Sequence, residues 1–302
     1  MQTIATDLQF PEGPIAMDDG SVILVEIARG TLSRVLPDGR IDVIADLGGG
    51  PNGAAIGPDG AVYVCNNGGF DWHRSGGRIF PGDAPDNYSG GRIERVDLST
   101  GTFEVLYQAC DGVPLQGPND IVFDAQGGFW FTDLGKSTGR LKDRGAVYYA
   151  TIDGNHIEQM LFPIETPNGV SLSPDETRLY VAETQGARLW AFDIASPGKL
   201  APPAATSSKT FIASPAGLCF FDSMAVEADG TVCVATIVNG GISRINPDDG
   251  SIRHVATDDP MTTNICFGGE DLKTAYMTLS STGRLVSMPW DTAGLALNFL
   301  NK

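Results

Sequence analysis

The sequence is poor in positive charge and in long apolar runs. Lysine and arginine together number 20, against 37 aspartate and glutamate residues, and the formal net charge is −17. Such a chain repels phosphate backbones and anionic membrane surfaces, so we expect neither nucleic acid nor membrane as a partner. No apolar stretch approaches the length of a membrane span, and the opening MQTIATDLQF lacks the charged start and apolar run of a signal peptide. We therefore expect a cytoplasmic protein.

Cysteine and histidine are scarce as well. The five cysteines are odd in number, and none stands in a C-x-x-C or Cys/His spacing typical of zinc. We expect them to be buried, reduced thiols. No Ser-His-Asp pattern is visible in the sequence, which argues against chemistry through a covalent acyl intermediate.

The sequence is rich in one repeated hairpin pattern. Each copy places two apolar strands around a tight turn, most often Asp-Gly or a relative, which is a strong β-hairpin signal. The copies span residues 11–27, 51–67, 118–134, 167–184, 221–237 and 263–279. Six more hairpins lie between them, and the fourth of these runs on to KTFI at 209–212. The mean period is about 50 residues, in the range of propeller blades.

This repeat predicts an all-β fold, a six-bladed β-propeller with four antiparallel strands per blade, in a single domain over residues 1–302. An open array of blades would leave pairing edges exposed. The opening QTIATDL resembles the fourth strands VIADL and RHVATD. We therefore expect the N-terminal strand to close the ring as the outer strand of the last blade.

An acidic or amide side chain starts the first strand of every blade. Alignment on the turn and second strand places six residues in one register: Glu12, Asn52, Asn119, Asn168, Asp222 and Asn264. In a propeller these starts meet around the central channel at one end, and we call the six residues the oxygen ring. Asn-Gly is also a turn former, and that interpretation stays open for Asn52 and Asn264. It does not explain Glu12 and Asp222, because two carboxylates in a narrow channel repel each other unless a cation is bound.

The donor set indicates the kind of metal. Carboxylate and amide oxygens suit a hard ion such as calcium, magnesium or manganese. The three histidines, His73, His156 and His254, fall outside the register. Zinc and iron are therefore possible but less indicated.

The motifs FPEGP, GPNDIVFDAQGGFWFTD, PNGVSLSPDETRLYVAET and GLALNF resemble the senescence marker protein/gluconolactonase/luciferin-regenerating-enzyme family, and its bacterial sugar lactonases in particular. The similarity runs over essentially the whole chain. It implies one divalent metal, with Ca²⁺ as the first choice, held by Glu12, Asn168 and Asp222. Asn119 would contact metal-bound water or substrate. The animal members place an arginine where this chain has Gly117, so the identity of the substrate does not transfer.

We accordingly predict a metal-dependent hydrolase that opens a sugar lactone to the aldonic acid, in a monomer or weak homo-oligomer. The cation would polarise the lactone carbonyl, and Asp222 would accept the proton of the attacking water, with Asp120 and Asp133 as fallback bases. Two alternatives stay open: a phosphotriesterase-like hydrolase in the same site, and a non-catalytic propeller that binds calcium and a protein partner.

Further substrate contacts are expected beside Asn119. Asp120 and Asp133 lie in the third blade, and the long connection 68–91 offers Trp72, His73 and Arg74. Long loops in compact domains are often lids or binding loops, although a glycine-rich surface loop is an equal alternative. In the third-blade loop LGKSTGRLKDRG, we expect Lys136 and Arg140 to be solvated.

Overall fold

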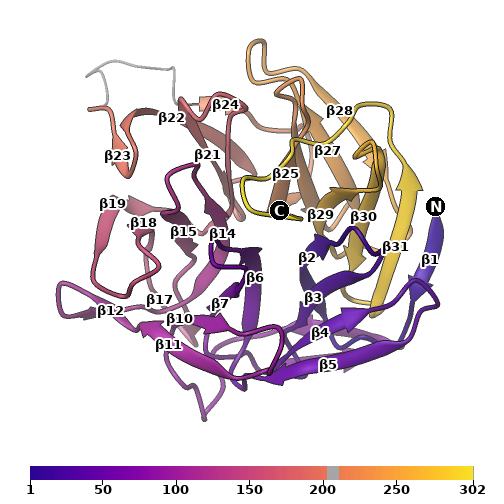
Figure 1. The fold of residues 1–302 in the computed structure, drawn as a ribbon, viewed down its shortest axis with the longest axis horizontal. Coiled ribbons are helices and arrows are strands. Elements are labelled where there is room, and N and C mark those ends of the chain that lie inside the picture. Colours follow the sequence, from indigo (N-terminus) through magenta and orange to yellow (C-terminus); the bar gives the residue numbers. More distant parts are fainter. Residues whose placement is uncertain (203–210, 302) are drawn as a thin grey trace.

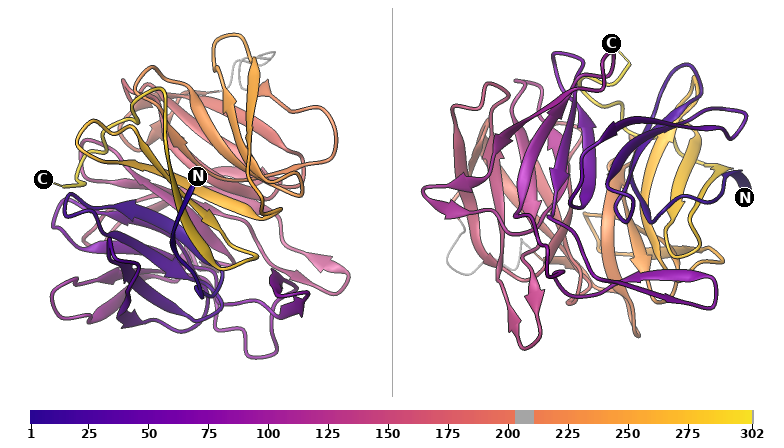
Figure 2. Two further views of the ribbon diagram at one scale, coloured as in Figure 1. Left: turned by 90° about the vertical axis from the view of Figure 1, so that its right-hand side faces the viewer. Right: turned by 90° about the horizontal axis from the view of Figure 1, so that it is seen from below.

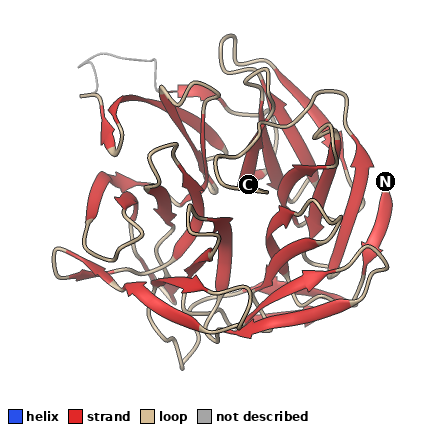
Figure 3. Cartoon of the chain, in the orientation of Figure 1, coloured by secondary structure: helices blue, strands red, loops and turns tan. Residues whose placement is uncertain are grey.

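The computed structural model describes residues 1–202 and 211–301, and these consist of strands, turns and loops without a helix (Figure 3). Six antiparallel sheets stand around a central channel as the blades of a propeller (Figure 1). The predicted all-β, six-bladed fold is confirmed. Within the described ranges nothing helical is present that could cross a membrane.

The blades follow one another in chain order, each with its first strand at the channel. Blade 1 contains β2 (Pro11–Ala16), β3 (Val22–Glu26), β4 (Thr31–Val35) and β5 (Ile41–Asp46); blade 2 contains β6 (Pro51–Ile56), β7 (Val62–Asn66), β10 (Arg92–Val96) and β11 (Phe103–Tyr107). Blade 3 contains β14 (Pro118–Phe123), β15 (Phe129–Asp133), β18 (Gly145–Ala150) and β19 (Ile157–Ile164); blade 4 contains β20 (Pro167–Leu172), β21 (Arg178–Glu183), β22 (Arg188–Ser196), the short β23 (Lys199–Leu200) and β24 (Phe211–Ala213). Blade 5 contains β25 (Phe220–Val226), β26 (Val232–Ile237), β27 (Gly241–Ile245) and β28 (Ile252–Ala256); blade 6 contains β29 (Thr262–Gly268), β30 (Thr274–Leu279), β31 (Arg284–Pro289) and β1 (Gln2–Ala5).

The N-terminal strand closes the propeller as predicted. β1 pairs antiparallel with β31, with Gln2 opposite Ser287, and so completes the last blade. The strand β24 corresponds to the predicted KTFI, of which residues 209 and 210 lie outside the described residues.

Apolar side chains fill the spaces between neighbouring blades. Between blades 2 and 3, Tyr63 packs edge-on against Phe123, and Phe131 stacks on Tyr148. Trp130 lies on the other face of blade 3 and is fully buried between blades 3 and 4. Since successive side chains of a strand point to opposite faces, each second strand supplies apolar groups to two interfaces, which explains its near-continuous apolar sequence.

The two ends of the channel differ. At the end where the first strands begin, three short hairpins extend the connections: β8 (Trp72–Ser75) with β9 (Arg78–Pro81), β12 (Ala109–Cys110) with β13 (Val113–Pro114), and β16 (Ser137–Thr138) with β17 (Leu141–Lys142). We call this the ring end. The C-terminal segment lies near the axis at the opposite end, the far end (Figures 1 and 2).

Candidate metal-binding and catalytic site

A β-bulge occurs at the oxygen-ring position of every blade. In each case the register between the first and second strand shifts just beyond the ring-end terminus: 12–15, 51–54, 118–121, 167–170, 221–224 and 262–264. A bulge inserts an extra residue and re-aims the side chains around it. The repeated bulge therefore turns the six oxygen-ring side chains out of the regular alternation of side-chain directions along their strands.

The glycine that follows an oxygen-ring residue serves close packing rather than a turn. Asn52 and Asn168 lie inside strands β6 and β20. A Cβ atom on Gly53 would stand 2.4 Å from the carbonyl oxygen of Asn119, and one on Gly169 would stand 2.8 Å from that of Asp222. The first strand of each of these blades thus touches the ring residue of the next blade, and only glycine leaves room for it.

The two oxygen-ring carboxylates, Glu12 and Asp222, form no ion pair with a cation in residues 1–202 or 211–301. Burial and the charge of Asp222 raise the pKa of Glu12 well above its usual value. Burial raises the pKa of Asp222 to about 8, a hydrogen bond from Asn168 lowers it, and the Asp120 charge raises it. Burial likewise raises the pKa of Asp120 to about 7. Three acidic groups that each resist ionisation mark a place where positive charge would be stabilised.

Amide groups complete the donor set. Asn264 Nδ2 and the Gly13 amide donate to Glu12 Oε2 at 2.7 and 2.6 Å. Asn168 Oδ1 accepts a long 3.3 Å bond from Ser223 Oγ, while its Nδ2 donates to Thr184 Oγ1. Asn119 Oδ1 is buried and has no hydrogen-bond partner among the described residues. A buried acceptor of this kind is rare without a ligand, an ion or water.

These residues fit a hard divalent cation. The described ranges bring together no group of three or more histidine, cysteine or acidic side chains of the spacing a metal needs, so amide oxygens would have to complete the ligand set. Glu12 and Asp222 supply two carboxylates, and Asn168 and the unpartnered Asn119 supply carbonyl oxygens. This all-oxygen set matches calcium or magnesium better than zinc.

The raised carboxyl pKa values predict an unusual pH dependence in metal-free protein. The unfolded chain releases these protons near pH 4, whereas native Asp222 holds its proton to about pH 8. The native state therefore binds more protons across that interval, and stability falls as pH rises. We expect chelated protein to melt at a higher temperature at pH 5.5 than at pH 8.

The control for this prediction is Asp222→Asn, which removes one titrating group without changing its size. The net charge of −17 also makes stability fall as pH rises, because the negative charges repel one another. The slope of melting temperature against pH must therefore be compared between wild type and Asp222→Asn. A shallower slope in the variant is expected. Parallel curves would show that Asp222 titrates normally.

Asp133 belongs to a repeated set that braces loops. Asp133, the last residue of the second strand, lies opposite Pro118, the first residue of the first strand. Glu26, Asn66 and Glu183 occupy the same position in blades 1, 2 and 4. The Asp133 carboxylate accepts hydrogen bonds from the backbone amides of residues 116, 117 and 135 at 2.7–2.9 Å. The contacts in the structure thus assign Asp133 to loop bracing, and its substrate contact stays a prediction.

Gly117 cannot be replaced by a larger residue on this backbone. A Cβ atom there would stand 2.6 Å from the carbonyl oxygen of Gly135. The absence of the arginine found in the animal proteins is therefore built into the packing of blade 3.

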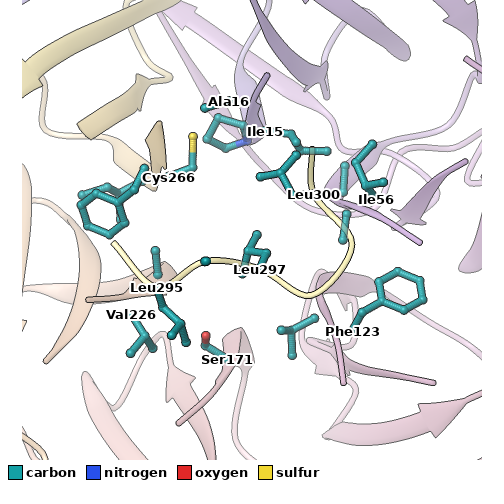
Figure 4. A pocket seen from close by; sticks show the side chains of 18 of the residues that line it. Ile15, Ala16, Ile56, Phe123, Ser171, Val226, Cys266, Leu295, Leu297 and Leu300 are labelled. Atoms are coloured by element: carbon teal, nitrogen blue, oxygen red, sulfur yellow. The ribbon is translucent and has the colours of Figure 1, made fainter. Parts of the chain in front are cut away.

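Asp120 is held below the ring. Its carboxylate accepts from the amides of Ile121 at 3.0 Å and Val170 at 3.2 Å, the latter on the neighbouring blade. It lines a largely apolar cavity of about 330 Å³ between the oxygen ring and the C-terminal segment. Leu295, Leu297 and Leu300 cross the far end of this cavity (Figure 4). The C-terminal GLALNF motif thus covers the far mouth of the channel.

The connection 68–91 packs over the ring end. Trp72 packs against Phe10 with ring centroids 5.1 Å apart and ring planes tilted by 50°, and Arg74 donates to Gln9 Oε1 at 3.0 Å. The Ile79 amide bonds to the carbonyl of Ser281 in blade 6. The predicted contact residues Trp72, His73 and Arg74 therefore lie on a hairpin bound to blades 1 and 6, with His73 and Arg74 exposed.

One residue of the third-blade loop differs from its prediction. Arg140 is exposed as expected, but Lys136 is 5 % exposed, so the prediction that Lys136 is solvated is wrong. Burial lowers its pKa to about 7. The lysine directly follows FTDLG, but nothing in the local sequence shows that the connection 68–91 folds over it.

The sequence profile described as the SMP-30/Gluconolactonase/LRE-like region matches residues 10–281. A lactonase drp35 of Staphylococcus saprophyticus is 30% identical over 229 residues, covering 75% of this chain and 63% of its own. A gluconolactonase of Zymomonas mobilis is 25% identical and covers 93% of this chain and 79% of its own. The chain thus spans less than two thirds of the length of the drp35 relative.

Solved structures share the fold. A gluconolactonase from Xanthomonas campestris superposes with a TM-score of 0.74 at 23% identity, covering 95% of this chain and 88% of its own. A calcium-binding protein, regucalcin, from Agrobacterium tumefaciens superposes with a TM-score of 0.76 at 18% identity, covering 100% and 97%. At these identities the likeness establishes the propeller fold.

Proposed function

Because the chain belongs to the SMP-30/gluconolactonase/LRE-like family, we propose that it is a metal-dependent lactonase that opens a sugar lactone to the hydroxy acid. The observation that carries this proposal is the oxygen ring itself. Glu12 and Asp222 are carboxylates that resist ionisation at one end of the channel, and the carbonyl oxygen of Asn119, in the same register, is buried without a partner among the described residues. A propeller that serves only as an interaction surface does not need this arrangement.

Three side chains would hold the cation. Glu12, Asn168 and Asp222 come from blades 1, 4 and 5 and present oxygen donors around the channel. Calcium is our first choice, since every donor is a hard oxygen. The bound cation supplies Lewis acidity, which polarises the lactone carbonyl. The relatives named lactonase and gluconolactonase support this reaction class.

Asp222 is proposed as the general base. Of the oxygen-ring residues it is the one that is partly exposed, so its carboxylate can reach both the site and incoming water. An Asp222 carboxylate oxygen accepts a proton from water as the water oxygen bonds to the lactone carbonyl carbon. When the ring C–O bond breaks, the same oxygen returns the proton to the departing alkoxide. The product leaves as a carboxylic acid that ionises in solvent.

Other residues orient the substrate. The Asn119 amide stands in the same register as the carboxylates and would offer a donor to a substrate oxygen. Asp120 is anchored by two backbone amides and faces the apolar cavity, so its expected substrate contact would come from below the oxygen ring. Trp72, His73 and Arg74 would contribute from the ring-end hairpin.

A metal-defined activity screen tests this function. Protein reconstituted with calcium, magnesium, manganese or zinc is assayed by pH-stat against pentono- and hexono-lactones and against a phosphotriester. We expect lactone hydrolysis with at least one metal. Stoichiometric metal binding without any hydrolysis would favour the calcium-binding propeller, and hydrolysis of the phosphotriester alone would favour the alternative hydrolase.

A further inference from the structure

Lys136 is a buried cation without an anionic partner. Its Nζ donates to Asn67 Oδ1 at 3.0 Å and to the carbonyl of Gly69 at 2.6 Å, and lies 3.7 Å from the centre of the Phe70 ring. No carboxylate in residues 1–202 or 211–301 forms an ion pair with it. Neutral oxygens and an aromatic face offset only part of the cost of burying an ammonium group.

The other buried cation in the described ranges shows the usual solution. Arg92 pairs with Glu94 through Nε and Oε1 at 2.6 Å, and its remaining donors reach Ser89 Oγ and the carbonyl of Leu47. Lys136 differs because no described carboxylate pairs with it directly. Burial lowers the pKa of Lys136 and the charge of Asp133 raises it from a distance, but the Asp133 carboxylate itself accepts from three backbone amides. A ligand could provide the missing direct partner.

Two neighbouring donors are unused. An ammonium group has three N–H donors, and Lys136 uses two of them within the protein. Asn67 Oδ1 accepts from both Lys136 and the Gly69 amide, which fixes the orientation of the side-chain amide. The buried Asn67 Nδ2 then has no acceptor among the described residues. A free ammonium donor and a free amide donor thus stand side by side.

The pair lies next to the oxygen ring. Asn67 directly follows β7, whose last residue is opposite Pro51, the neighbour of Asn52. Lys136 follows β15, whose last residue is opposite Pro118, the neighbour of Asn119. At a rise of about 3.3 Å per residue, both side chains start within a few residues of the ring, between blades 2 and 3. The pair and the oxygen ring therefore lie at the same end of the propeller.

We infer that Lys136 and Asn67 form a carboxylate subsite, and that the preferred substrate is a sugar lactone with a free carboxylate at the end remote from its ester, as in the lactones of hexaric acids. The inference rests on the proposed lactonase function. A carboxylate accepts from two adjacent donors and supplies the missing counter-charge. A neutral hexono-lactone offers a hydroxyl there and leaves the ammonium without a hydrogen-bonded counter-charge.

Asn67→Asp is the sharpest test. The new side chain keeps an oxygen for the Gly69 amide and for Lys136, replaces the free donor with an acceptor, and gives Lys136 an internal counter-charge. We expect a folded protein with an unchanged or higher melting temperature. For the hexaro-lactone, kcat/KM should fall about 10- to 100-fold, mainly through KM, while hydrolysis of the hexono-lactone stays close to wild type.

Lys136→Met is the second variant, and Lys142→Met is its matched control, because Lys142 lies exposed on the adjoining strand β17. Lys136→Met should lose the preference for the hexaro-lactone over the hexono-lactone, whereas Lys142→Met should keep this preference. Two outcomes would show that Lys136 and Asn67 serve only to hold the loops together: equal falls in kcat/KM on both lactones in the variants, or a preference of the wild-type protein for the neutral lactone.

Binding separates this inference from the proposed function. Calorimetry on metal-loaded protein compares the hexarate dianion with the hexonate anion, and it needs no turnover. Wild type should bind hexarate at least about tenfold more tightly, and Asn67→Asp should not. If no lactone is hydrolysed but wild type still binds hexarate more tightly than hexonate, the proposed lactonase function would be refuted and the carboxylate subsite would stand. Equal affinities would refute the subsite and mean that water alone occupies it.

Discussion

Chelation of the purified protein is expected to lower lactone hydrolysis by about a thousandfold or more, because the Lewis acid supplies several kcal/mol of transition-state stabilisation. Elemental analysis should find about one divalent ion per chain before chelation. Removal leaves Glu12 and Asp222, whose carboxyl groups already resist ionisation in the folded protein, without a counter-charge. Activity should return on addition of calcium.

Thermal unfolding gives a readout independent of turnover. A ligand that binds only the native state stabilises it by about 2.7 kcal/mol at a concentration one hundred times its Kd. We therefore expect metal to raise the melting temperature of wild type and to have little effect on Glu12→Gln. Full activity after exhaustive chelation, with no metal detected, would refute the metal site.

Asp222→Asn should separate binding from proton transfer. The variant keeps an oxygen ligand of similar size but cannot accept a proton from water. Metal affinity should weaken modestly, since one ligand charge is lost, while turnover falls by about 10²- to 10⁴-fold, the usual cost of removing a general base. The measurement is hydrolysis at saturating metal, with metal occupancy determined on the same sample.

The matched control is Asp46→Asn, the same substitution at an exposed position at the end of β5. It should leave both metal affinity and turnover at wild-type values. If saturating metal restores near wild-type turnover to Asp222→Asn, then Asp222 acts as a ligand only. The base would then have to be sought at Asp120 or at the metal-bound water itself.

Local chemistry determined most of the fold. Asp-Gly turns between alternating apolar strands specify hairpins within a few residues of sequence, so their number and period could be read without tertiary information. The closing strand was also predictable, because an unpaired edge must be covered and QTIATDL carries the pattern of an outer strand. The pairing of β1 with β31 bears this out.

The sequence also placed six polar residues in one register, which suffices to predict a ring of oxygen atoms. It could not show what each side chain does there. Asn-Gly suggested a turn, whereas Gly53 is required by the carbonyl of Asn119 on the next blade. The sequence predicted Asp133 as a site residue but could not show that three backbone amides from two loops donate to its carboxylate.

Only the tertiary structure decided the environment of Lys136. Its partner Asn67 is 69 residues away in the sequence, and the aromatic ring beside it belongs to a connection that leaves blade 2 and folds back over the ring end. Burial of a charge depends on every group that surrounds it in space, and these groups come from separate blades. The sequence by itself therefore determined the repeat, the closure and the acidic register, while the packing of blade against blade decided which polar groups are left without partners.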